Sequence, residues 1–151
     1  MILNSLYAFF ATLGFGILFN IKGRNLIFAS IGGSIGWFFY ALFLKLNCSE
    51  VTALFLSSVA FSSYSEIMAR VLKTPVTTFV ICALIPLVPG GGMYYTMLEI
   101  IQGNPAKAMD TGLNTLSSAG SLAVGIIFVS SISRLISVAK NYKFRENKNT
   151  L

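Results

Sequence analysis

Long apolar stretches separated by short polar turns divide the chain into five segments. They cover about residues 2–20, 26–46, 51–72, 76–102 and 112–136. Each is near the ~20 residues that an α-helix needs to cross a hydrocarbon core of about 30 Å. The pattern predicts an all-α integral membrane protein whose five transmembrane helices form residues 1–137. Residues 138–151 would be a basic cytoplasmic tail, whose polar end, 141–151, we expect to be disordered.

The fourth segment is interrupted in its middle by two prolines and three glycines. Backbone groups freed by such a break cost several kcal/mol in lipid unless protein or a water-filled cavity satisfies them. In transporters, breaks of this kind form substrate and ion sites. The helix after the break would point its positive end and free N–H groups at a carboxylate. The predicted substrate-binding residues here are Pro86, Pro89, Gly90, Gly91, Gly92, Tyr94 and Tyr95. A proline kink without a ligand is the alternative.

The third segment carries a polar face, because Ser58, Ser62, Ser65 and Glu66 follow helical spacing. A carboxylate within the hydrocarbon costs roughly 2.5–3.5 kcal/mol, so its default interpretation is functional. Glu66 would then couple transport to protons or to the substrate, with Ser62 as a substrate contact. Arg70 follows one turn later, at the spacing of an ion pair with Glu66. A purely structural pair is the equally weighted alternative.

Small residues in two segments predict close helix packing. Gly32 and Gly36 have the spacing that lets two helices approach in lipid, although lining of a permeation path is the alternative for them. In the fifth segment, Ser118 and Ser121 belong to a small polar stripe that also includes Asn114 and Gly125. We expect this stripe to pack against the broken segment.

Composition and charge agree with a membrane protein. The chain is 55% hydrophobic and only 11% charged, whereas soluble domains carry about 25% charged residues. With five spans, most of the net charge of +6 falls on one side of the membrane. The basic residues on that side are Lys22, Arg24, Arg70, Lys73, Lys140, Lys143, Arg145 and Lys148. This positive-inside asymmetry places the N-terminus outside and the C-terminus in the cytoplasm, and it argues against nucleic acid as a partner.

Catalytic and metal sites find little support in the sequence. The chain has no histidine and only two cysteines, which lie far apart, so neither a zinc nor a haem site is expected. No Ser/His, Asp/Asp or His/Glu combination is present, and Glu66 and Glu99 lie on different spans without a metal-binding neighbour. We therefore predict a protein that is not an enzyme and has no cofactor.

Several motifs together give the chain a family resemblance. They are Phe19-Asn20, Arg24-Asn25-Leu26, Gly32-Gly33-x-x-Gly36, Glu66-x-x-Ala69-Arg70-x-x-Lys73-x-Pro75, and Ile85-Pro86-Leu87-Val88-Pro89-Gly90 leading into Tyr94-Tyr95. With these, up to about residue 137, the chain resembles the smaller, C-terminal membrane unit of the threonine/serine exporter (ThrE) family. In bacteria this unit often occurs as a separate short protein.

The resemblance implies a subunit of a secondary-active exporter of small hydrophilic metabolites, either threonine and serine or a small organic acid. It would act in the bacterial cytoplasmic membrane with a larger partner that carries the N-terminal unit, and self-association is a further expectation. The span number agrees, because a related five-span unit would lie inverted beside this one. A structural or assembly subunit that carries no solute is the alternative.

Overall fold

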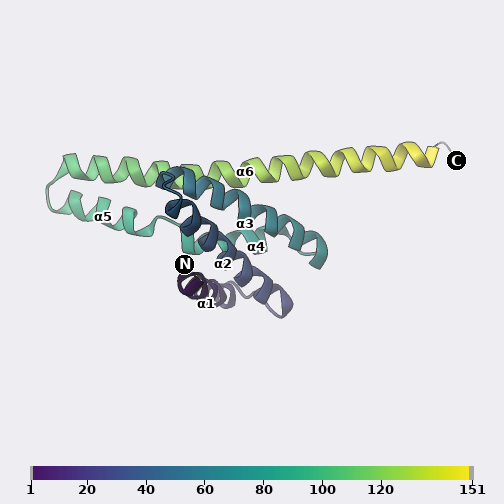
Figure 1. Ribbon diagram of the computed structural model, residues 1–151, viewed down its shortest axis with the longest axis horizontal. Coiled ribbons are helices and arrows are strands. Elements are labelled where there is room, and N and C mark those ends of the chain that lie inside the picture. Colours follow the sequence, from purple (N-terminus) through teal and green to yellow (C-terminus); the bar gives the residue numbers. More distant parts are fainter. Residues whose placement is uncertain (1, 150–151) are drawn as a thin grey trace.

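The computed structural model describes the backbone of residues 2–149 and the side chains of residues 2–139, and over that range it contains helices and no strands (Figure 1). The elements are α1 (Ile2–Leu18), α2 (Arg24–Lys45), α3 (Glu50–Leu72), α4 (Val76–Leu84), the 3₁₀ turn η1 (Ile85–Leu87), α5 (Gly90–Ile101) and α6 (Pro105–Asn149). The prediction of an all-α protein is confirmed.

Local chemistry explains where the first three helices end. Each is followed by a residue in the left-handed region: Asn20 after α1, Asn47 after α2 and Lys73 after α3. Asparagine enters this region more easily than most residues, because its short side chain bonds the nearby backbone. After Lys73, the restricted φ of Pro75 prevents α3 from continuing, and α4 begins at the next residue.

Three helices are each long and apolar enough to cross a membrane: α2, α3 and the Pro105–Ala139 part of α6. The segments Val76–Leu87 and Gly90–Ile101 pass the same test only together, and they are bent by 53° at the break between them. The apolar helix α1 is shorter, at 17 residues. By length and composition the described chain therefore has three candidate spans, or four if the bent pair is one span. The count of five stays a prediction.

Helix α2 lies at the centre of a body formed by α1, α2, α3 and α4 (Figure 1). Gly32 and Gly36 are buried on its inner face. A Cβ atom at Gly32 would lie 3.3 Å from both Ala83 and Tyr64, and one at Gly36 would lie 3.1 Å from Leu87. The two glycines therefore let α3 and α4 approach the backbone of α2 closely.

Helices α3 and α6 run side by side in the same direction. Ser58 contacts Gly125, Glu66 accepts a hydrogen bond from Ser133, and Arg70 donates to Ser137, so contacts advance together along both helices. Two parallel neighbours require a connection that returns the chain to its starting level. The bent segment α4–η1–α5 is that connection.

The hairpin of α5 and the first part of α6 extends away from the body, as the left side of Figure 1 shows. Among the described residues, α5 packs mainly against α6 and buries none of its own side chains. Thr115 lies against Gly92, and Thr96 lies 3.3 Å from the position of a Cβ atom on Gly112. We call this hairpin, residues 90–117, the arm.

The structure corrects two predicted boundaries. Residues 105–149 form one helix, which contains the predicted segment 112–136. The part of the tail that the structure describes, residues 141–149, is therefore helical and not disordered, while residues 150–151 lie outside the described chain. Lys, Arg and Glu propagate a helix that has already nucleated, so the apolar segment extends into its polar continuation. The second half of the bent segment, which the sequence predicts as a helix over residues 93–102, also begins earlier, at Gly90.

Candidate functional site

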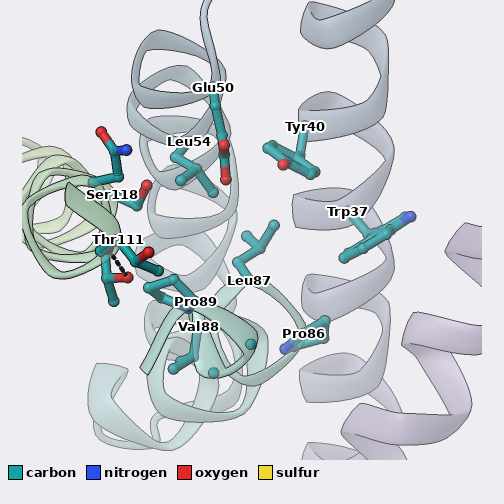
Figure 2. Close-up of a pocket in the computed structure, with 15 residues that line it drawn as sticks. Trp37, Tyr40, Glu50, Leu54, Pro86, Leu87, Val88, Pro89, Thr111 and Ser118 are labelled. Atoms are coloured by element: carbon teal, nitrogen blue, oxygen red, sulfur yellow. Dashed lines mark hydrogen bonds between the residues drawn. The ribbon is translucent and has the colours of Figure 1, made fainter. Parts of the chain in front are cut away.

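An open cavity of about 430 Å³ lies where α5 begins, bordered by α2, α3, the break and α6 (Figure 2). Its lining residues are Trp37, Tyr40, Glu50, Leu54, Pro86, Leu87, Val88, Pro89, Gly90, Gly91, Gly92, Thr111, Asn114, Thr115 and Ser118. Five of the predicted binding residues, the two prolines and three glycines of the break, thus line one cavity.

The break is a sharp backbone turn at Pro89. Its φ of −75° and ψ of 57° bring the N–H of Gly90 to 2.7 Å from the carbonyl oxygen of Val88. Met93 then donates to the carbonyl oxygen of Pro89 at 3.2 Å, which closes the first turn of α5. Because Pro86 and Pro89 carry no N–H, η1 cannot continue smoothly into α5.

Gly91 and Gly92 leave their N–H groups free at the start of α5. No described residue accepts a hydrogen bond from either group, as is usual for the first turn of a helix. A Cβ atom at Gly90 or Gly91 would meet nothing within 4 Å. The backbone at the positive end of α5 is therefore open to a solute with a negative group.

Gly92 has a different role from its two neighbours. A Cβ atom there would collide with the side chain of Thr115. The Thr115 hydroxyl donates to the carbonyl oxygen of Thr111 at 2.7 Å, and Thr96 donates to the carbonyl oxygen of Gly92 at 2.7 Å. Gly92 is thus needed for packing of the arm, and it also lines the cavity.

The opposite wall carries a negative group. Figure 2 shows Glu50 reaching from the first turn of α3 into the space between Tyr40 and Leu54. Asn114 and Ser118 add neutral polar groups from α6. The cavity therefore places free amide donors on one side and a carboxylate on another, with hydroxyl and amide side chains between them.

Not all of the predicted binding residues reach this cavity. Tyr94 and Tyr95 are 63% and 58% exposed on the arm and stack edge to face against each other. Ser121 donates to the carbonyl oxygen of Ser118 within α6. Ser118, predicted only as a packing residue, is in the cavity wall, whereas Gly125 of the same stripe packs against α3 and not against the break.

Glu66 and Arg70 form a second polar cluster, far from the first. The Ser133 hydroxyl donates to Glu66 at 2.5 Å, and Arg70 donates to the Ser133 hydroxyl at 2.6 Å and to Ser137 at 3.1 Å. The direct distance between the Arg70 guanidinium and the Glu66 carboxylate is 3.9 Å. Ser133 therefore bridges the pair. Along α3, Glu66 is roughly 24 Å from Glu50, at about 1.5 Å per residue.

The sequence did not predict the part of the cavity lining that lies near the end of α2 and in the first turns of α3 and α6. Tyr40, Glu50 and Thr111 were not predicted as site residues. On α6 a signal was present, because Thr111, Thr115 and Ser118 recur at helical spacing on one face. For Glu50 there was none, since an acidic residue in the first turn of a helix is ordinarily accounted for by the helix dipole alone.

One of the comparisons with known proteins gives a family. The sequence profile described as "Threonine/Serine exporter, ThrE" matches residues 4–132. An uncharacterized protein of Haemophilus influenzae is 26% identical over 103 residues, which are 68% of this chain and 34% of that protein. The match thus spans about a third of the relative's length. No solved structure gives a significant match.

Proposed function

The chain belongs to the threonine/serine exporter family, and we propose that it is one membrane unit of a secondary-active exporter of small hydrophilic metabolites in a bacterial cytoplasmic membrane. The observation that carries the proposal is the cavity at the break, where the free N–H groups of Gly91 and Gly92 adjoin open space. Free backbone donors at an interrupted helix are how transporters hold solute carboxylates. Nothing in this role requires covalent chemistry, in agreement with a family of transporters.

The charges of the cavity favour an amino acid over a dicarboxylate. The amides of Gly91 and Gly92 would take the α-carboxylate, and Glu50 would take the ammonium group. A second carboxylate on the solute would meet Glu50 as a like charge, which costs binding energy. Asn114 and Ser118 supply the neutral partners that a side-chain hydroxyl needs. Threonine or serine therefore fits this lining better than a small organic diacid.

A five-span topology is part of the proposal and is supported by how the helices run. Because α3 and α6 are parallel neighbours, the bent segment must cross once between them. Asn25 donates to Thr74 at 3.1 Å, so the loop before α2 and the loop before α4 lie at the same end of the body. That end carries Lys22, Arg24 and Lys73. The positive-inside rule then puts this end in the cytoplasm and the N-terminus outside.

A larger membrane partner completes the proposed exporter. The H. influenzae relative has about two thirds of its length outside the match, which is room for a further unit in one chain. We propose that the exporter contains such a unit beside the residues described here. The exposed apolar side chains of the arm, such as Met93, Met97 and Ile101, are consistent with contact to such a unit or to lipid. They also keep open the alternative of an assembly subunit that carries no solute.

Efflux measurements test the proposal against this alternative. The chain would be purified with whatever membrane protein accompanies it and reconstituted into vesicles loaded with radiolabelled threonine or radiolabelled succinate. We expect gradient-driven efflux of threonine that exceeds efflux of succinate and requires this chain. Equal flux from vesicles that contain the partner alone would assign this chain an assembly role.

A further inference from the structure

The contact between α3 and α6 forms a line that begins at the cavity, with the apolar residues Leu54 and Leu122 at its start and small or polar residues beyond them. From Leu54 and Ser118 at the cavity wall, this line passes Ser58 against Gly125 and reaches Glu66 against Ser133. We call this line of contact the seam. The seam connects the cavity at the break with the cluster of Glu66, Arg70 and Ser133.

Ser62 lies in the middle of the seam, one helical turn from Ser58 and one from Glu66 on the same face of α3. Its side chain is 1% exposed, and its hydroxyl has no hydrogen-bond partner among the described residues. Buried hydroxyl groups are almost always paired, because an unpaired one costs about 1–3 kcal/mol. Neighbouring Ser58 and Ser65 each donate to a carbonyl oxygen of α3. Ser62 therefore places a buried hydroxyl group at the seam that has no hydrogen-bond partner among the described residues.

The far end of the seam is closed by a group that also binds carboxylates. Arg70 is half exposed and lies 3.9 Å from the Glu66 carboxylate, too far for a direct hydrogen bond. Its hydrogen bonds go to the carbonyl oxygen and hydroxyl of Ser133 and to the hydroxyl of Ser137, all on α6. A guanidinium prefers a carboxylate to such neutral acceptors. A solute carboxylate that reaches Arg70 would therefore compete with the bonds that hold α6 against α3.

We propose that the seam between α3 and α6 is the route of the solute between the Arg70 end and the cavity, with Ser62 as a contact on the way. This inference rests on the proposed function. In the described structure the route is closed, by Arg70 with Ser133 at one end and by Leu54 with Leu122 beside the cavity. A solute carboxylate takes Arg70 from α6, the seam separates, and the Ser62 hydroxyl donates to the passing solute.

Thiol labelling distinguishes this route from ordinary helix packing. In a background with Cys48→Ser and Cys82→Ala, Ser62→Cys is compared with Ser57→Cys during threonine efflux. Ser57 is a matched control, since it is equally buried on α3 but donates to the carbonyl oxygen of Gly36 on α2. We expect a small charged methanethiosulfonate reagent to modify Ser62→Cys at least tenfold faster during efflux than at rest, with Ser57→Cys unmodified in both conditions. Equal rates at the two positions, or no modification at Ser62→Cys in an exporting complex, would overturn the proposal.

A cross-link provides a second test that does not depend on labelling. A Cβ atom added at Gly125 would lie 3.1 Å from the Cβ of Ser58 and 3.0 Å from the carbonyl oxygen of Phe55. A shift of α6 away from α3 by a few tenths of an ångström would bring the two Cβ atoms to the ~3.5–4.5 Å of a disulfide. Oxidation of a Ser58→Cys/Gly125→Cys pair should abolish threonine efflux, and a reductant should restore it. The pair Gly32→Cys/Ala83→Cys, whose Cβ atoms would be 3.3 Å apart across α2 and α4, serves as the control: its oxidised and reduced forms should expel threonine at equal rates.

Efflux from the reduced complex and from the background protein distinguishes an error in the proposed route from an error in the proposed function. If the reduced Ser58→Cys/Gly125→Cys complex expels threonine and the oxidised complex expels it equally well, the seam is not the route. If the background protein with its partner expels no threonine at all, the proposed function itself is wrong.

Discussion

At the scale of single residues, the proposed solute site rests on two glycines with free N–H groups and one carboxylate. Gly91 and Gly92 provide donors at the positive end of α5, and Glu50 provides the opposite charge across the cavity. The break could be predicted from the sequence, because prolines and glycines within an apolar run bend or interrupt the helix that the run would otherwise form. Glu50 and Tyr40 could not, since they reach the cavity only through the packing of α2 and α3 against segments that are distant in the sequence.

Glu50→Gln tests the charge of the cavity. The change keeps the size of the side chain and removes the partner of the solute's ammonium group, a charge-assisted bond of about 1.5–3 kcal/mol. Threonine efflux should therefore fall by about tenfold or more at low substrate concentration, while succinate efflux does not fall. Glu99→Gln, on the arm outside the cavity lining, is the control and should leave both unchanged. Equal threonine efflux in Glu50→Gln would remove Glu50 from the site.

The cluster at Glu66 allows the coupling and the structural hypotheses to be separated. If Glu66 only holds Arg70 and Ser133 in place, Glu66→Gln should lower the yield of assembled complex. The double change with Arg70→Gln should then be less harmful than the two single changes added together, with a coupling of about 0.5–3 kcal/mol. If Glu66 couples transport, the single variant should instead assemble normally and export poorly. Normal assembly with normal efflux in Glu66→Gln would exclude both the structural role and the coupling role of Glu66.

At the scale of elements, glycines decide how closely α2 meets its neighbours. Gly36 lies 3.1 and 3.2 Å from side-chain atoms of Leu87 and Phe61, measured from the position of a Cβ atom. Gly36→Leu should therefore destabilise the protein by about 1–3 kcal/mol through overpacking. We expect a lower yield of folded complex in detergent, measured by size-exclusion chromatography. Gly14→Leu is the control, because a Cβ atom at Gly14 meets nothing within 4 Å. Equal yields for both variants would show that α2 does not need this close approach.

The helix ends show which boundaries the hydrophobic pattern of the sequence predicts and which it does not. The ends of α1, α2 and α3 agree with the predicted segments to within two residues, because apolar runs and polar turns alternate clearly there. The start of α6 was missed by seven residues, although Pro105 occupies the first helical position, where proline is common. A hydrophobic pattern cannot find such a start, since the first turns of α6 carry Lys107 and Asp110.

At the scale of the whole molecule, the parallel course of α3 and α6 determines the proposed topology. A reporter fused after Leu151 should show cytoplasmic activity, and one placed in the loop between α2 and α3 should show activity outside. Both follow from one crossing by the bent segment and from basic residues on the cytoplasmic side. A C-terminal reporter outside the membrane would contradict the five-span topology and the inverted arrangement with a partner.

The central claim is that the open backbone at the start of α5 binds the solute. Gly91→Val tests it most directly, because valine fills the open space beside the free N–H groups without meeting any other described atom at its Cβ. Gly14→Val is the matched control, with the same substitution at an equally open position in α1. In vesicles that contain the purified complex, we predict at least a tenfold loss of threonine efflux for Gly91→Val, with assembly unchanged and full efflux for Gly14→Val. Full efflux in an assembled Gly91→Val complex would contradict binding at this backbone.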